Sequence, residues 1–117
     1  MSGIRSYHAG LAAEESVALL YSRSGRPVAA RRWRGQAGEI DLVVRDGARV
    51  IFIEVKQSRT HALAAEHLSA RQMGRIYDAA AEFLAGEPDG QATNAQFDVA
   101  LVDGTGRIEL LENAFAA

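Results

Sequence analysis

The distribution of hydrophobic and polar residues between positions 39 and 56 predicts a β-hairpin. Segments 39–45 (EIDLVVR) and 48–56 (ARVIFIEVK) are rich in β-branched residues, and they flank the dipeptide Asp46-Gly47. Asp-Gly between two such segments is one of the strongest short-range hairpin signals. We therefore expect two antiparallel strands joined by a two-residue turn at Asp46 and Gly47.

That turn length decides which side chains share a face of the hairpin. Because side chains alternate along a strand, Asp41 is expected opposite Phe52, which makes Asp41 and Glu54 diagonal neighbours at roughly 7–8 Å between Cα atoms. Lys56 follows on the same face, and Glu39 is expected opposite Glu54. The other face is wholly apolar and is expected to be core: Ile40, Leu42, Val44, Ile51, Ile53 and Val55.

Two further segments carry helical patterns. Residues 8–24 are rich in alanine and leucine and predict a helix that Gly25 ends. Ser69 and Gln72 match a capping box, so a second helix is expected to begin there and to end before Gly86. Its buried face is predicted to consist of Met73, Ile76, Tyr77, Ala80 and Leu84.

The rest of the chain predicts three more strands and one loop. Residues 28–33, 96–102 and 107–111 are expected to form strands, and residues 57–67 a loop with room for a helical turn. The element order is then α-β-β-β-α-β-β. We expect one α/β domain over residues 1–117, with a mixed β-sheet flanked by helices.

Composition limits the kinds of site and the cellular compartment that we expect for this protein. The chain has no cysteine, which excludes disulfides and thiolate metal sites, and no apolar run long enough to cross a membrane. A start without the features of a signal peptide makes the cytoplasm the expected compartment. The net charge of −2 argues against a protein that coats nucleic acid non-specifically.

The basic residues are nevertheless concentrated in one region. No acidic residue occurs between Glu15 and Glu39, and this interval holds several arginines. Arginines beside an aromatic ring suit contact with the backbone and bases of nucleic acid. A solvated surface explains the charge pattern equally well, and a tryptophan in such a segment is more often core. The candidate contacts are Arg31, Arg32 and Arg34, around Trp33.

The charges of the hairpin indicate metal and phosphate chemistry. In the predicted register, carboxylates gather at one rim together with Lys56, which is the only lysine of the chain. Carboxylates that share a rim become favourable when they bind one divalent cation, and Mg²⁺ or Mn²⁺ prefers such oxygen ligands. An ammonium beside that metal can grip a phosphate and stabilise the charge that develops during hydrolysis. A cross-strand ion pair on a solvated face is the alternative.

These residues also carry a family resemblance. The pair GEID…FIEVK resembles the active-site core of the PD-(D/E)xK nuclease superfamily. From Gly10 to Phe115 the chain resembles the YraN family of small bacterial proteins, which are similar to archaeal Holliday-junction resolvases. R-W-R before GEIDL, the strand QFDVALV and the closing ENAF belong to the match. The resemblance implies a restriction-endonuclease-like core.

The resemblance also implies roles for individual residues. Asp41 and Glu54 would bind the metal, with Glu14 as the family's acidic residue on the first helix. Lys56 would position or activate the attacking water. Glu39 is included in the resemblance, and it is either a residue around the metal that does not ligate it or a charge at the strand edge. Gln57, next to Lys56, is either a polar neighbour of the site or the residue that opens the following loop.

The chain departs from the family pattern at two positions. Gln72 stands where relatives usually carry a lysine, and Gln96 where they commonly carry an arginine. These losses affect the grip on substrate more than the chemistry. Arg71 or Arg75 can supply the missing positive charge near the start of the second helix.

Together these features favour a metal-dependent endonuclease acting on DNA, with branched or structured DNA as the expected substrate. Paired cleavage of a symmetric junction would imply a homodimer. The alternative is a nucleic-acid-binding module that keeps the fold without turnover. A third reading is a structural protein whose rim charges form ion pairs.

Overall fold

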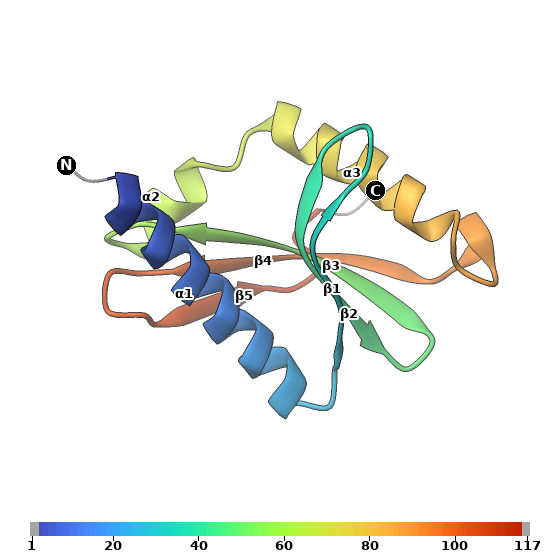
Figure 1. Ribbon diagram of the computed structural model, residues 1–117, viewed down its shortest axis with the longest axis horizontal. Helices are drawn as coiled ribbons and strands as arrows, with labels where there is room; N and C mark the ends of the chain where they lie inside the picture. The colour runs from blue at the N-terminus through green and yellow to red at the C-terminus, as the bar shows by residue number, and fades with distance from the viewer. Residues whose placement is uncertain (1–2, 116–117) are drawn as a thin grey trace.

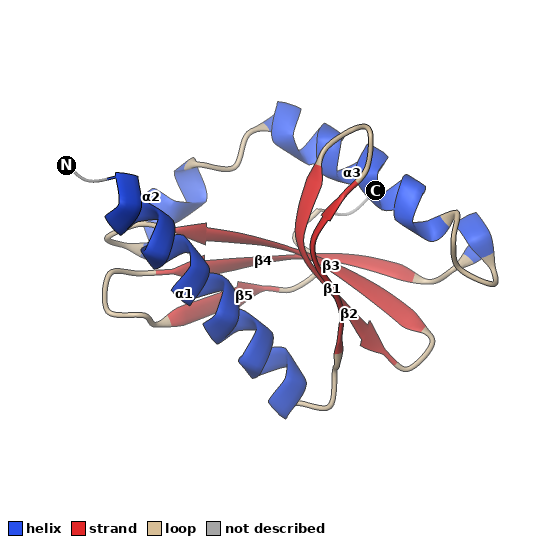
Figure 2. Cartoon of the chain, in the orientation of Figure 1, coloured by secondary structure: helices blue, strands red, loops and turns tan. Residues whose placement is uncertain are grey.

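The computed structural model describes residues 3–115, with the side chains of residues 9–115. A five-stranded sheet in the order β1-β2-β3-β4-β5 forms the centre of the molecule, and helices pack against it (Figures 1 and 2). The elements are α1 (Gly3–Arg23), β1 (Val28–Arg34), β2 (Glu39–Asp46), β3 (Arg49–Gln57), α2 (His61–Glu66), α3 (Ala70–Leu84), the 3-10 turn η1 (Gly90–Ala92), β4 (Ala95–Val102) and β5 (Ile108–Leu111).

This architecture confirms the predicted mixed α/β fold and its α-β-β-β-α-β-β order. Strands β3 and β4 are parallel, and every other neighbouring pair is antiparallel. A parallel pair needs a crossover connection, and α2 with α3 provides it. The short helix α2 occupies part of the segment 57–67 that was expected to be a loop, with Thr60 as its N-cap. No helix within residues 3–115 is long and apolar enough to span a bilayer.

Helix α1 covers one face of the sheet. Its buried side chains lie three and four positions apart, which is the spacing of one helical face. They pack against a cluster of strand residues on β2, β3 and β4. The helix ends as predicted, because Gly25 adopts φ +81° and the Arg26 N–H donates to the Tyr21 carbonyl. The core on this side contains Ala13, Val17, Ala18, Tyr21, Leu42, Val44, Ile51, Ile53, Ala100 and Val102.

Helix α3 covers the opposite face. Ser69 is its N-cap, and the Ser69 hydroxyl accepts a hydrogen bond from the Gln72 N–H at 3.1 Å. Ala79, Ala80 and Leu84 pack onto Val43, Val50 and Phe52, among others. Both faces of the hairpin are therefore covered near the turn, and β3 is buried from Val50 to Glu54.

The hairpin register differs from the prediction by two residues. Asp46 pairs with Arg49, and the turn consists of Gly47 and Ala48. Gly47 adopts φ +62° at the first turn position, a conformation that glycine tolerates and aspartate rarely adopts. The predicted pairing of Asp41 with Phe52, and of Glu39 with Glu54, was therefore wrong. Continuing the observed register by one step places Asp41 opposite Glu54.

Strand β1 contains a break in the alternation of its side chains. Arg32 has φ 48°, in the left-handed region that residues other than glycine seldom occupy. Consequently Arg31 and Arg32 both reach carboxylates on α1, whereas Trp33 packs edge-on against Phe83 of α3. Ile40 pairs with Trp33 and lies in the α3-side core, so its predicted place on the other face was wrong.

The loop between β1 and β2 is fixed to α3, which it approaches in Figure 1. The backbone N–H groups of Gln36 and Ala37 donate to the Glu82 carboxylate at 2.7 and 2.8 Å. A β-carbon on Gly35 would collide with Glu82 and with the Trp33 ring. This contact holds the turn end of the β1–β2 hairpin against the helix and so fixes the direction of the strand that carries Asp41.

A buried polar network ties α1 to β4 and to the C-terminal segment. Asp98 is 1% exposed and accepts hydrogen bonds from the Tyr21 hydroxyl at 2.6 Å, the Gln96 amide at 2.8 Å and the Asn113 N–H at 2.9 Å. Burial and the Asp98 contact raise the pKa of Tyr21, so this phenol stays protonated as a donor. Each oxygen of the buried carboxylate is thereby satisfied.

Candidate functional site

Asp41, Glu54 and Lys56 come together at the open end of the β2–β3 hairpin, away from its turn at Gly47 and Ala48. Asp41 Oδ2 accepts a hydrogen bond from the Val55 N–H at 2.8 Å. The side chain of Asp41 on β2 therefore binds a backbone N–H of β3 that would otherwise bind a backbone carbonyl in the sheet. Lys56 Nζ lies 3.8 Å from Glu54 Oε1, and its side chain is 16% exposed. The structure therefore assembles the three residues that the sequence singled out.

Burial dominates the electrostatics of the two carboxylates. It raises the pKa of Asp41 to about 6, although the hydrogen bond from Val55 opposes the shift. Burial, followed by the negative charge of Asp41, raises the pKa of Glu54 to about 8, and the Lys56 ammonium opposes that shift. Because the two groups repel each other, they titrate as a pair, and holding both in the ionised form requires more positive charge than Lys56 alone supplies.

The oxygens of Glu54 have unequal surroundings. Oε1 accepts a hydrogen bond from the Gln72 side-chain amide at 3.1 Å and faces Lys56. Oε2 is buried and has no hydrogen-bond partner among the described residues. A buried, unsatisfied carboxylate oxygen is costly unless a ligand binds it. Asp41 and Glu54 together can hold a hard cation such as Mg²⁺, which commonly takes one or two protein carboxylates and completes its shell with water.

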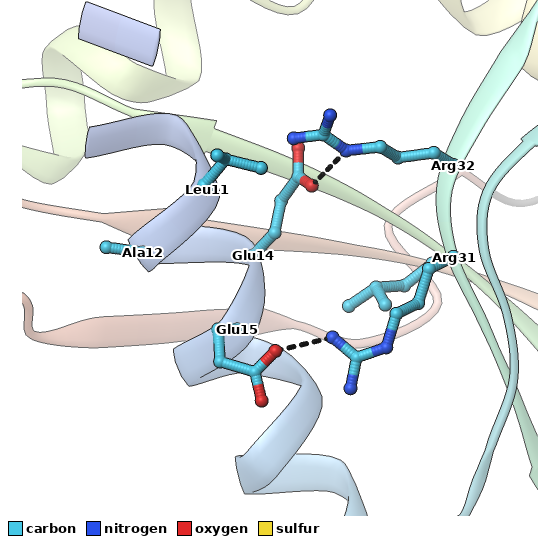
Figure 3. A pocket seen from close by; sticks show the side chains of 7 residues that line it. Leu11, Ala12, Glu14, Glu15, Arg31 and Arg32 are labelled. Atoms are coloured by element: carbon cyan, nitrogen blue, oxygen red, sulfur yellow. Dashed lines mark hydrogen bonds and ion pairs between the residues drawn. The ribbon is translucent and has the colours of Figure 1, made fainter. Parts of the chain in front are cut away.

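Glu14 does not complete a three-carboxylate set. Its Oε1 accepts a hydrogen bond from Arg32 Nε at 2.9 Å, across the cleft between α1 and β1 (Figure 3). Its negative charge still contributes to the raised pKa of Asp41. Over residues 3–115, no group of three or more histidine, aspartate or glutamate side chains lies close enough to hold a metal ion.

The arginines of β1 are engaged by acidic side chains. Arg31 Nη1 binds Glu15 Oε2 at 2.6 Å, beside the Glu14–Arg32 pair (Figure 3). These two ion pairs line a cleft of about 480 Å³. At the end of the strand, Arg34 pairs with Glu39 at 3.1 Å, so Glu39 is committed to an exposed ion pair. Nucleic acid would have to displace these carboxylates to reach the predicted contacts on β1.

Arg71 and Arg75 differ from the arginines of β1. They lie one turn apart on the exposed surface of α3, and within the described part of the chain neither forms an ion pair. They flank Gln72, whose side chain reaches Glu54. The structure therefore leaves two positive side chains available next to the helix residue that contacts the carboxylate pair.

The two glutamines that depart from the family pattern have defined partners. Sequence reasoning gave Gln72 a role in the capping box, and its backbone N–H fills that role. Its side chain, however, contacts Glu54, which lies 18 positions earlier in the chain, and no local pattern could reveal this contact. Gln96 accepts from Arg49 at 2.8 Å and donates to Asp98, so it belongs to the buried network. Gln57 lines a separate cleft between α1 and the β4–β5 turn.

The raised pKa of Glu54 predicts how stability depends on pH. A carboxyl whose folded-state pKa lies above its unfolded value of 4.5 contributes fully to stability below that value and loses this contribution as pH rises through about 8. The Glu54→Gln side chain cannot ionise and can still accept from Gln72. We expect its Tm to match that of the wild type near about pH 4 and to exceed it by on the order of 5 °C at about pH 9.

Thermal unfolding followed by circular dichroism across this pH range measures the difference. Glu66→Gln, on the exposed surface of α2, is the matched control that removes one carboxylate away from the pair. Curves for Glu54→Gln and the wild type that stay parallel over the whole range would show that the site does not disfavour ionised Glu54.

The fold and the site define a small mixed α/β protein with one half-buried and one buried carboxylate, and a lysine, at the open end of its central hairpin. Residues 13–102 match the model of an uncharacterised protein family, UPF0102. A UPF0102 protein of Cereibacter sphaeroides strain KD131 is 71% identical over 117 residues, the full length of both chains. A UPF0102 protein of Ruegeria pomeroyi is 63% identical over 113 residues, covering 97% of this chain and 92% of the relative.

A more distant UPF0102 protein, from Dinoroseobacter shibae, is 44% identical over 111 residues, covering 95% of this chain and 83% of the relative. The chain therefore belongs to the UPF0102 family, which is the YraN family that its motifs resemble.

Proposed function

We propose that this protein is a metal-dependent endonuclease that hydrolyses phosphodiester bonds in DNA, with structured or branched DNA as its substrate. The observation that carries the proposal is the pairing of the half-buried Asp41 with the buried Glu54 beside the only lysine of the chain. A stabilising ion pair needs one carboxylate per ammonium, whereas this site places two carboxyl groups beside one ammonium. The resemblance to PD-(D/E)xK nucleases supports the same assignment.

In this proposal Asp41 and Glu54 hold Mg²⁺ or Mn²⁺, and Glu14 can join them only by leaving Arg32. The cation supplies Lewis-acid activation of the scissile phosphate and of a bound water. Lys56 donates hydrogen bonds to the attacking water and to the phosphate oxygens, and stabilises the negative charge that grows on them. Partial burial keeps the ammonium poorly hydrated, which strengthens both contacts.

The grip on the nucleic-acid backbone is assigned first to Arg71 and Arg75. These guanidiniums can bind phosphates without breaking an ion pair, whereas Arg31, Arg32 and Arg34 must exchange a carboxylate for a phosphate. Such exchange reduces the net gain, because a contact is lost for each one formed. The β1 arginines then act as a second, weaker contact region.

The test is a panel of duplex, single-stranded, flapped and four-way-junction DNA, with matched RNA, incubated with the protein in Mn²⁺. We expect cleavage of at least one structured DNA, and a loss of about 100-fold or more in the Asp41→Asn protein. Asp46→Asn is the matched control, because Asp46 lies on the same strand at its exposed turn end. Equal cleavage by wild type and Asp41→Asn would contradict the proposal.

Paired cleavage of a symmetric junction implies a homodimer. Light scattering of the protein–junction mixture measures whether two copies of the protein bind one junction.

One observation favours a second candidate function. Among the described residues no third metal-binding side chain joins Asp41 and Glu54, because Glu14 is paired with Arg32. A binding module that docks on nucleic acid without turnover is consistent with such a reduced site. A junction that is shifted in Mg²⁺ but never cut, in Mg²⁺ or in Mn²⁺, would identify this function.

A further inference from the structure

The hydrogen bond from the Gln72 side chain bears on the orientation of the Glu54 carboxylate. Both donors near Glu54, the Gln72 amide and the Lys56 ammonium, face the same oxygen, Oε1. The other oxygen, Oε2, is buried without a partner in the part of the chain that the structure describes. The hydrogen bond from Gln72 at 3.1 Å and the ion-pair contact with Lys56 at 3.8 Å both favour a rotation of the carboxylate that turns Oε1 toward them. They leave Oε2 as the atom that can accept a ligand.

Gln72 lies in the first turn of α3, where its backbone and its side chain have different partners. The Ser69 hydroxyl binds the backbone N–H of Gln72, which anchors the first turn of the helix. In a reciprocal capping box the glutamine side chain would turn back to the N-cap N–H. Here the side chain instead crosses to β3 and binds Glu54. Backbone and side chain of Gln72 therefore have separate functions, and they can be tested separately.

The chemistry of the amide matters as much as its place. A glutamine donates one hydrogen bond to the carboxylate without adding charge, so the charge of the ionised pair is still left for Lys56 and a cation to balance. A lysine at this position would neutralise Glu54 and would compete with a cation for it. A neutral donor is thus the kind of group that holds a metal-binding carboxylate in place while leaving its affinity for a cation intact.

We propose that Gln72 is a positioning residue, which holds Glu54 Oε1 so that Oε2 faces a divalent cation shared with Asp41. This inference rests on the proposed function only for the existence of the cation site. Its ligand is a hard divalent cation, represented by Mn²⁺. The role is separate from helix capping, which Gln72 performs through its backbone alone.

The experiment measures Mn²⁺ affinity by calorimetric titration of the purified protein, with no nucleic acid present. Gln72→Met keeps the length of the side chain and removes its donor, and we expect it to weaken Mn²⁺ binding about 10-fold. Gln72→Lys should weaken binding more, because it adds a competing charge. Ser69→Ala is the matched control: it removes the cap but leaves the Gln72 side chain, so Tm should fall while affinity stays within about twofold.

The possible outcomes distinguish the positioning role of Gln72 from the proposed metal-dependent nuclease function. If Gln72→Met binds Mn²⁺ as tightly as the wild type, or if Ser69→Ala weakens binding as much, the positioning role is wrong and the cation site stands. If the wild type binds no Mn²⁺, both the role of Gln72 and the proposed metal chemistry are wrong. If the wild type binds Mn²⁺ in a Gln72-dependent manner but cuts no substrate, the positioning role stands and the nuclease proposal fails.

Discussion

Replacing Lys56 by methionine is expected to reduce cleavage by about 100-fold to 1000-fold, in line with the loss of a single charge-stabilising donor from an active site. Methionine keeps the unbranched apolar stem of lysine and removes only the ammonium. That ammonium lies 3.8 Å from Glu54 Oε1 and is the one positive group that offsets the raised pKa of Glu54. The substitution therefore removes a donor to substrate and makes ionised Glu54 less favourable.

Lys56→Arg distinguishes the effect of the positive charge from the effect of the compact ammonium group. Arginine preserves the positive charge but replaces a compact ammonium by a planar guanidinium with different donor directions. We expect Lys56→Arg to retain less than about a tenth of the activity and to keep Tm within a few degrees of the wild type. Initial rates on the best substrate in Mn²⁺, together with Tm for each variant, measure both effects. Full activity in Lys56→Met would remove Lys56 from the proposed chemistry.

Asp98→Ala is expected to lower the free energy of unfolding by about 3 kcal/mol or more. The substitution removes the common acceptor of three hydrogen bonds, so the buried Tyr21 hydroxyl, the half-buried Gln96 amide and the Asn113 N–H lose their partner. Unsatisfied buried donors cost more than the original bonds contributed. Against a total stability of about 5–15 kcal/mol for a domain of this size, such a loss is large.

Urea unfolding of Asp98→Ala and two milder variants tests this account. Asp98→Asn keeps an acceptor oxygen for Gln96 and Asn113, and Tyr21→Phe removes only the hydroxyl that binds Asp98. We expect each of these to cost about 1–2 kcal/mol. A cost for Asp98→Ala no larger than that of Tyr21→Phe would mean that the other two donors find new partners.

Much of the fold was predictable because it rests on local patterns. The two long helices follow from their apolar spacing and from the signals at Gly25 and Ser69, which act on the nearest turn of the chain. The element order was also predictable, since each strand is rich in apolar residues between turn signals. The register of the central hairpin was not, because the choice between Asp46 and Gly47 as the first turn residue depends on a positive φ that only Gly47 adopts here.

The candidate site was likewise predictable only in part. The motif itself marked Asp41, Glu54 and Lys56, because charged residues at the end of an apolar hairpin conflict with simple core formation. The partners of Glu14, Arg31 and Arg32 could not be read from the chain, since they depend on how α1 lies across a strand that changes face at Arg32. The same holds for Gln72, whose side chain could equally have closed a capping box.

The amino-acid sequence by itself determined which groups could do chemistry and which segments would be helix or strand. Those properties follow from residue type and from interactions within one or two turns of backbone. Only the tertiary structure decided that Asp41 faces Glu54, that acids on α1 engage the arginines of β1, and that Gln72 holds one oxygen of Glu54 while the other stays open. These contacts join residues far apart in the chain, and their geometry is set by packing on both faces of the sheet.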